Sequence, residues 1–204
     1  MRVDRRRFLT GLGSGACLGA TPSMAAFSCD AQRCIASVDP TRFTRIYAAQ
    51  QMENWCWAAS LSMLFGYYGH PVSQQRIVAE VYGGLVDEPA TSLQVSQQVN
   101  RNWIDDFGRP FTARLLAAYD YAYGVNALDN NTIINALVGE HPLLFGNETH
   151  ATVLTGVEYL PTSVVNTPGT EATILNAVMF DPWPGIGERP PKAVSSWRQA
   201  MAAR

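Results

Sequence analysis

The middle of the chain carries a stretch in which apolar side chains recur at helical spacing. They fall at positions i, i+4, i+7, i+8 and i+11, which are occupied by Trp57, Leu61, Leu64, Phe65 and Tyr68. Because a helix turns by about 100° per residue, these side chains share one face, and the spacing predicts a helix with a buried stripe. Asn54 is the expected N-cap, and Gly66 and Gly69 mark the expected end.

Similar patterns predict the remaining elements. Further helices are expected at 73–82, 92–99, 112–121, 130–138 and 195–201. Gly83-Gly84 and Gly139 end the first and the fourth of these, and Asn130-Asn131-Thr132 caps the fourth. Short apolar or β-branched runs between turn residues predict strands at 142–145, 151–159 and 173–180, with a loop at 166–169.

Helices therefore come first and strands afterwards. This order predicts an α+β domain with an N-terminal helical lobe and a C-terminal antiparallel β lobe, rather than a doubly wound sheet. The chain has 204 residues, of which 47% are hydrophobic and 16% charged, enough for one well-packed domain. The formal net charge is −2 and no basic stripe is present, so nucleic acid is not expected as a partner.

The first residues predict an export signal. Arg5-Arg6-Arg7-Phe8-Leu9 is followed by a glycine-rich run at 11–20, and Ser23-Met24-Ala25 offers small residues at a peptidase cleavage site. The run is too short to span a bilayer, and the arginines resemble a twin-arginine signal, with a Sec signal as the alternative. We therefore expect residues 1–25 to be removed. Residues 26–204 would form a periplasmic or secreted domain without stable membrane insertion.

The cysteines fit an oxidising compartment. Cys17 leaves with the signal, and Cys29 and Cys34 are close enough to pair, which leaves Cys56 as the odd thiol. A C-x4-C zinc site is the alternative for Cys29 and Cys34, but no second Cys/His pair stands at ligand spacing. We expect the disulfide, and neither a metal nor a cofactor.

The candidate chemistry centres on Cys56. It lies in the first turn of the helix predicted from the apolar stripe, within Asn54-Trp55-Cys56-Trp57-Ala58-Ala59-Ser60, and Gln50 precedes it by six positions. A helix N-terminus carries roughly half a positive charge, which favours the thiolate over the thiol. On this register Cys56 points away from the buried stripe, so the thiol can face a groove.

A base and an orienting carboxylate are available further along the chain. His70 and His141 each precede a proline, whereas His150 opens the predicted strand at 151–159. Asp181 follows the next predicted strand. Antiparallel pairing of these strands would bring Asp181 beside His150, where the carboxylate could fix the imidazole tautomer and support its cationic form.

These segments resemble a known superfamily. Cys56-Trp57-Ala58-Ala59-Ser60 with Gln50 upstream is similar to the nucleophile segment of papain-like cysteine peptidases. The later segments 150–156 and Phe180-Asp181-Pro182 resemble the histidine and acidic strands of a bacterial branch. That branch includes the double-glycine leader peptidases and effector proteases of plant pathogens.

The resemblance implies a role for each matched residue. Cys56 would be the nucleophile, His150 the general base and acid, and Asp181 the third member of the triad. Gln50 would donate to the oxyanion, with the neighbouring Gln51 as its rival. The implied activity is that of an exported cysteine endopeptidase that hydrolyses peptide or protein substrates through a thioester, without a cofactor.

Three alternatives to this activity stay open at the level of sequence. The same triad could serve a deamidase or transglutaminase, or a hydrolase of cell-wall peptides. The fold could also serve a catalytically inert peptide-binding protein. The oligomeric state is open as well.

Overall fold

The structure is a computed structural model that describes residues 26–147, 149–161, 171–193 and 199–203. The predicted export signal at 1–25 and the predicted loop at 166–169 lie outside these residues. The five helices of the described part are α1 (Pro40–Ile46), α2 (Cys56–Tyr67), α3 (Gln74–Tyr82), α4 (Ser92–Gln98) and α5 (Asn130–Val138).

Eleven strands accompany these helices in the described ranges. They are β1 (Ala26–Cys29), β2 (Cys34–Ser37), β3 (Arg101–Ile104), β4 (Pro110–Ala113), β5 (Leu115–Asp120), β6 (Val125–Asn126), β7 (Leu143–Gly146), β8 (Ala151–Leu160), β9 (Thr173–Asp181), β10 (Gly187–Ala193) and β11 (Gln199–Ala203). All described strand pairs are antiparallel, so the predicted α+β class is confirmed.

Nine of the strands form one large sheet built around β8. Its main path runs β1-β2-β8-β7-β11-β5-β6, and β9 pairs with β8 and with β10. Strands β7 and β2 follow one another along one edge of β8, and β9 occupies the other edge. Gly156 lies where β8 passes closest to β2, because a Cβ there would stand 3.0 Å from the Cβ of Ser37.

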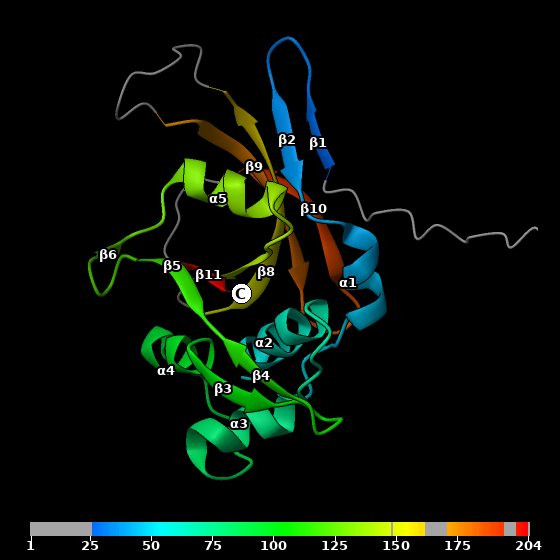
Figure 1. Ribbon diagram of the computed structural model, residues 1–204, viewed down its shortest axis with the longest axis vertical. Helices are drawn as coiled ribbons and strands as arrows, with labels where there is room; N and C mark the ends of the chain where they lie inside the picture. Colours follow the sequence, from blue (N-terminus) through cyan, green and yellow to red (C-terminus); the bar gives the residue numbers. More distant parts are fainter. Residues whose placement is uncertain (1–25, 148, 162–170, 194–198, 204) are drawn as a thin grey trace, which may run out of the picture.

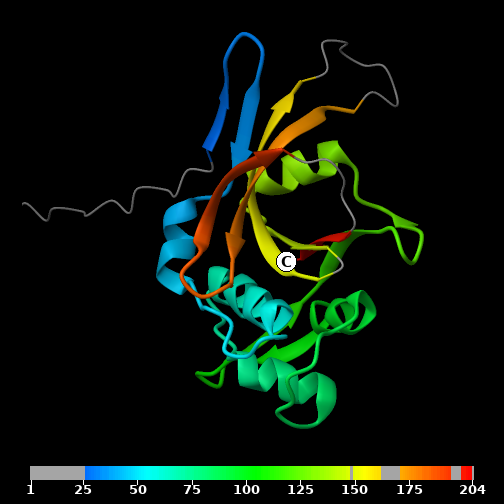
Figure 2. The ribbon, with the colours of Figure 1, turned by 180° about the vertical axis from the view of Figure 1, so that it is seen from behind.

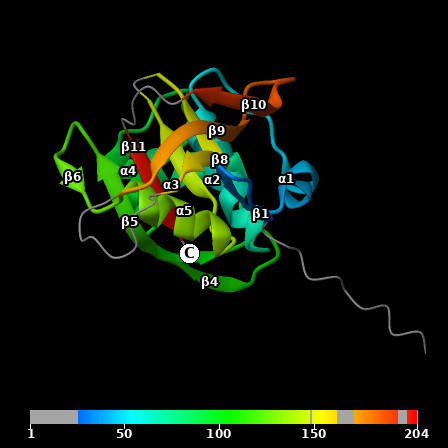
Figure 3. The ribbon, with the colours of Figure 1, turned by 90° about the horizontal axis from the view of Figure 1, so that it is seen from above.

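The helices are divided between two ends of the molecule. Figure 1 shows α2, α3, α4 and the β3–β4 hairpin at one end and the large sheet with α5 at the other. Seen from behind, β9 and β10 run in front of α5 (Figure 2), and the view from above shows α5 lying across the sheet (Figure 3). Helix α2 packs against β8, so the helix that begins at Cys56 touches the strand that His150 precedes.

The apolar stripe that predicted α2 forms part of the core. Trp57, Leu61, Leu64 and Phe65 are all buried. Helix α3 ends where the sequence predicts, because Gly83 takes the left-handed conformation with φ of 73°. No helix in the described ranges is long and apolar enough to cross a membrane.

Two predicted helices are wrong. Residues 112–121 fall on β4 and β5, although alanine, leucine and arginine favour a helix there. Strand β5 pairs with β6 on one side and with β11 on the other, and this long-range pairing overrides the local preference. In the second segment, 195–201, residues 199–201 belong to β11, which is held between β5 and β7; residues 195–198 lie outside the described ranges.

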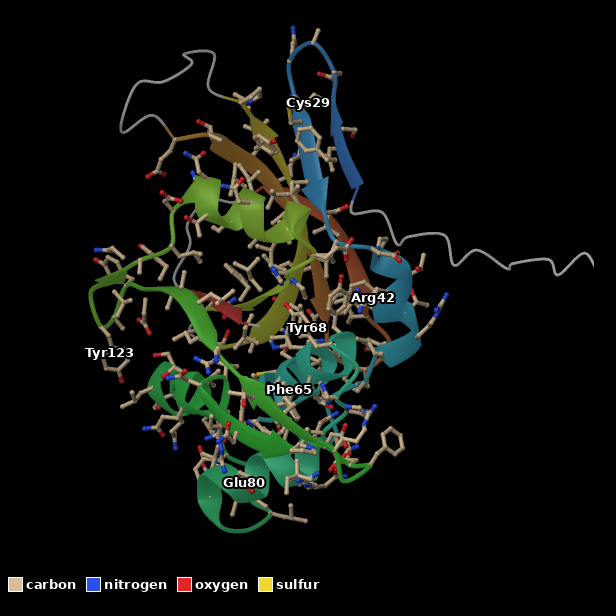
Figure 4. All side chains as sticks on the ribbon, in the orientation of Figure 1. Cys29, Arg42, Phe65, Tyr68, Glu80 and Tyr123 are labelled. Carbon is tan, nitrogen blue, oxygen red and sulfur yellow. A yellow bond between two sulfur atoms is a disulfide. The ribbon has the colours of Figure 1, made fainter. Side chains whose placement is uncertain are left out.

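The predicted disulfide is present. Cys29 and Cys34 are register partners in the β1–β2 hairpin, with their Cα atoms 4.0 Å apart. Figure 4 labels Cys29 in this hairpin, at the opposite end of the molecule from Glu80 on α3. The bond therefore closes a hairpin at the start of the described chain.

Candidate active site

Cys56 is the first residue of α2. Its side chain is partly exposed, whereas the next residue, Trp57, is only 3% exposed. The N-cap is Trp55 and not the predicted Asn54, and no side chain caps the helix. The first N–H groups of a helix have no acceptor within it, so the backbone N–H of Cys56 points out of the helix end together with the positive end of the dipole.

Asn54 is engaged elsewhere, in a clamp on the loop that follows α3. Asn54 Nδ2 donates to the carbonyl of residue 87 at 3.1 Å. The indoles of Trp55 and Trp57 donate to the carbonyls of residues 86 and 88, at 2.7 and 3.1 Å. Three side chains around the thiol therefore hold three consecutive carbonyls, which fixes this loop beside Cys56.

His150 stands immediately before β8 and is fixed through its backbone. Asn147 Oδ1 accepts the His150 N–H at 2.8 Å, and the Asn147 N–H donates to the His150 carbonyl at 2.9 Å. One residue further on, Ser60 Oγ on α2 donates to the Ala151 carbonyl at 3.2 Å. Helix α2 and the start of β8 are thus joined directly next to the site.

Asp181 ends β9 and contacts the imidazole as the strand pairing predicts. His150 Nε2 lies 2.7 Å from Asp181 Oδ1, and Asp181 is only 1% exposed. The same oxygen accepts the Trp183 N–H at 2.8 Å. The Trp183 ring stands edge-on to the imidazole, with 6.5 Å between the ring centroids.

The thiol and the imidazole line the same cavity, and the thiol affects the pKa of the imidazole. A hydrogen-bonding interaction with Cys56 is the largest cause that raises the pKa of His150 above its ordinary value, and Asp181 raises this pKa further. Partial burial of the ring opposes both effects. Because Nε2 is engaged by Asp181, Nδ1 is the ring nitrogen left for the thiol.

Cys56 and His150 share the lining of a cavity of about 330 Å³. One wall comes from the clamped loop and α4, through Pro89, Ala90, Ser92 and Val95. The opposite wall comes from β7 and the turn before β8, through Leu144, Gly146, Asn147 and Thr149. Cys56 and His150 therefore face a space that could hold a side chain of a ligand.

Gln50 lies near the same strand end but outside this lining. Its backbone N–H donates to the Pro182 carbonyl at 2.7 Å, directly after Asp181. Its Nε2 donates to the carbonyls of Met52 and Glu53, at 3.0 and 2.7 Å. Gln50 Oε1 is buried and accepts no hydrogen bond from the described residues. Both Nε2 hydrogens are thus occupied in this structure.

Gln51, the alternative donor to the oxyanion, and the other two histidines have partners away from the thiol. Gln51 is exposed, and its side chain accepts a hydrogen bond from Gln75 on α3. His70 Nδ1 contacts Asp105 at 3.2 Å, and His141 contacts the hydroxyl of Tyr68. The described residues contain no group of three or more His, Cys, Asp or Glu side chains that could hold a metal.

The comparison with protein families decides between the possible affiliations of this fold. A family described as papain-like cysteine protease AvrRpt2 matches residues 40–202, a span that contains Gln50, Cys56, His150 and Asp181. The chain belongs to the AvrRpt2 family. No curated protein and no solved structure is similar enough to the chain to count as a match.

The AvrRpt2-family assignment gives the general activity. The protein is a cysteine protease, a hydrolase that acts on peptide bonds, and its substrate is a peptide or a protein. This confirms the predicted superfamily.

Sequence reasoning missed the loop at 86–90, Ser92 of α4 and Asn147 as parts of the site. The sequence feature that could have pointed to this loop is the pair of indole N–H groups in Trp55 and Trp57, because buried indoles need hydrogen-bond acceptors.

Proposed function

We propose that this AvrRpt2-family protease is an exported endopeptidase in which Cys56, His150 and Asp181 form a catalytic triad. The main support is the contact of 2.7 Å between His150 and Asp181. The nearby Cys56 thiol raises the pKa of the same ring. The cavity at this point supports the entry of a peptide. No observation favours transfer, deamidation or an inert scaffold over hydrolysis.

The chemistry follows from the positions of these groups. The Cys56 thiolate attacks the peptide carbonyl carbon, and His150 as imidazolium gives its proton to the leaving amine. The thioester that remains is attacked by water, from which His150 takes a proton; the acid product leaves and the thiolate–imidazolium pair is restored. Asp181 holds the ring and supports its positive charge throughout.

The oxyanion needs two donors. The N–H of Cys56 is one, because it stands at the free helix end. Gln50 is the second in our proposal, and it can serve only after one of its Nε2 hydrogens leaves the carbonyl of Met52 or Glu53. A developing negative charge favours that exchange, because charge-assisted hydrogen bonds are about twice as strong as neutral ones.

Incubation with a diverse peptide library tests the activity. Mass spectrometry of the wild type should show new termini, and Cys56→Ala should produce none. A deamidase would leave the peptides uncut with side-chain amides converted to acids, and a transglutaminase would cross-link them. An inert scaffold would change nothing, and any of these three results would refute the proposal.

Thiol reactivity tests the triad independently of the substrate. Alkylation of Cys56 near pH 6 should be rapid in the wild type and slow in His150→Ala. His141→Ala is the matched control, because His141 contacts Tyr68 and not the thiol. Equal rates in the wild type and His150→Ala would remove His150 from the triad.

Export is the remaining part of the proposal. The Cys29–Cys34 disulfide supports it, since such bonds persist in oxidising compartments. Removal of residues 1–25 would leave β1 whole, because this strand begins at Ala26. Cell fractionation should find a mature chain that starts at Ala26 outside the cytoplasm. Arg5→Lys with Arg6→Lys should block this export if the twin-arginine route is used, and a Sec signal would tolerate the change.

A further inference from the structure

Among the described residues, Cys56 and His150 are the only members of the cavity lining that can carry a charge. The cavity walls are mainly apolar, with Pro89, Val95 and Leu144 among them. A charged group placed there would lose its hydration without gaining a partner of opposite charge, which is costly in a protein interior. The cavity is therefore suited to an uncharged side chain of the substrate.

Ser92 is one of the polar residues of these walls. The residue is buried, with only 8% of its surface exposed. Its Oγ has no hydrogen-bond partner in the part of the chain that the structure describes. The backbone of α4 does not need this hydroxyl, since the capping box is made by Thr91 and Gln94.

The other polar side chains of the lining already have partners. Asn54 and Trp57 donate to carbonyls of the clamped loop. Asn147 accepts from the hydroxyl of Thr149 and from two backbone N–H groups. A buried hydroxyl without a partner is unfavourable, so Ser92 is the group of the lining that gains most from a new hydrogen bond.

Ser92 belongs to the lining of the cavity, where a substrate group could come close to its hydroxyl. The Oγ is covered in the free protein, but a serine side chain has a single heavy-atom torsion with three staggered positions. Rotation about this torsion moves the hydroxyl without moving α4. A substrate side chain that fills the cavity and ends in a neutral hydrogen-bonding group could then pair with it.

We propose that Ser92 is a specificity-determining residue, and that this protease selects peptides whose cavity-filling side chain is uncharged and carries a hydroxyl. The proposal rests on the proposed function, since the cavity selects substrate only if Cys56 and His150 cleave it. A site that hydrogen-bonds a substrate hydroxyl rejects the analogue without it, whereas an apolar pocket barely separates the two.

Matched peptides test this selection. One peptide that the wild type cleaves is varied at each position around the scissile bond, with Tyr compared with Phe and Thr compared with Val. At one position the wild type should cleave the hydroxyl member about fivefold faster in kcat/KM, the factor expected from one net hydrogen bond. Ser92→Ala should abolish that preference, so that it cleaves the two members of the pair with equal kcat/KM.

Ser96→Ala is the matched control on the same helix. Its Oγ donates to the Leu93 carbonyl at 2.8 Å and does not line the cavity, so the preference should survive in this variant. Thermal unfolding of both variants checks that α4 remains folded. A preference that persists in Ser92→Ala, or that disappears in Ser96→Ala as well, would overturn the assignment.

Failure of this inference differs from failure of the proposed function. Cleavage without any hydroxyl preference would overturn the role of Ser92 and leave the triad intact. Absence of cleavage for every peptide, in the wild type as in Cys56→Ala, would overturn the proposed function and the inference with it.

Discussion

Replacement of Asp181 by asparagine tests the electrostatic part of the site most directly. Asparagine keeps the shape and one carbonyl oxygen, so it can still accept from the Trp183 N–H and orient the ring of His150. What it removes is the negative charge next to the imidazolium. The variant therefore separates the charge of the third residue from its positioning role.

The size of the expected loss follows from the attraction between the Asp181 carboxylate and the His150 imidazolium. At an effective dielectric constant of about 20, two unit charges roughly 4 Å apart attract each other by about 4 kcal/mol. The His150 side chain is 23% exposed, so solvent screens part of this attraction, and we discount it to about 2 kcal/mol. That energy corresponds to about a 30-fold loss of the imidazolium form, and hence of kcat/KM, at a pH above the wild-type pKa of His150, and to a smaller loss near neutral pH.

The dependence of the rate on pH shows the direction of the effect of Asp181. Cys56 and Asp181 both raise the pKa of His150, so the imidazolium persists above the pH at which a free histidine loses its proton. Asp181→Asn lowers that pKa, and the alkaline fall in kcat/KM and in alkylation of Cys56 should move to lower pH. Both rates are measured from about pH 5 to 10, a range that brackets ordinary histidine titration.

Asp105→Asn is the control for this experiment. Asp105 is also buried and also contacts a histidine, His70 at 3.2 Å, but it lies in the β3–β4 hairpin, and neither of the two lines the catalytic cavity. Its replacement should lower stability and leave the pH profile of the protease unchanged. An Asp181→Asn variant with the wild-type rate and an unmoved alkaline limb would refute the electrostatic reasoning.

Three further predictions concern the neighbourhood of the triad and the fold. Gln50→Ala should lower kcat by about 10²–10³ in steady-state kinetics, and an unchanged kcat would remove Gln50 from the oxyanion role. The double replacement Cys29→Ser with Cys34→Ser removes the disulfide, whose two cysteines have a sequence separation of 5. Denaturant unfolding should show about 2 kcal/mol less stability with kcat/KM unchanged, and equal stability would show that the hairpin unfolds separately from the rest. Ser60→Ala removes the bond to the Ala151 carbonyl and should cost about 1 kcal/mol in the same assay; no loss would mean that this bond contributes little.

The parts of the fold that follow from local pattern were predictable. The apolar stripe located α2, and glycine at the right distance located the end of α3. The pairing of β8 with β9 followed from two short apolar runs, and it brought Asp181 to His150. These inferences succeeded because each rests on neighbours in sequence or on one hairpin-like connection.

The failures share a different cause. Residues 112–121 have the composition of a helix, and only their pairing with β11, some eighty residues later, makes β5 a strand. The hydrogen bonds of the Gln50 side chain could not be predicted either. Its amide donates to carbonyls two and three residues further on, and these bonds depend on the path of the loop. The cavity wall around Ser92 depends on a loop whose path no periodicity records. Long-range partners and loop paths are therefore what the pattern of side chains leaves out.

The clamp of Asn54, Trp55 and Trp57 on the loop after α3 has a consequence for how this protease could diversify. All three side chains grip main-chain oxygens, and every amino acid supplies one of these. Side chains at 86 and 88 can therefore be exchanged without loosening the grip, whereas the Asp87 carboxylate also accepts the Asn54 N–H at 2.8 Å and is part of it. Variation at this rim, natural or engineered, could retune which sequences are accepted while the sulfur and its helix stay where they are.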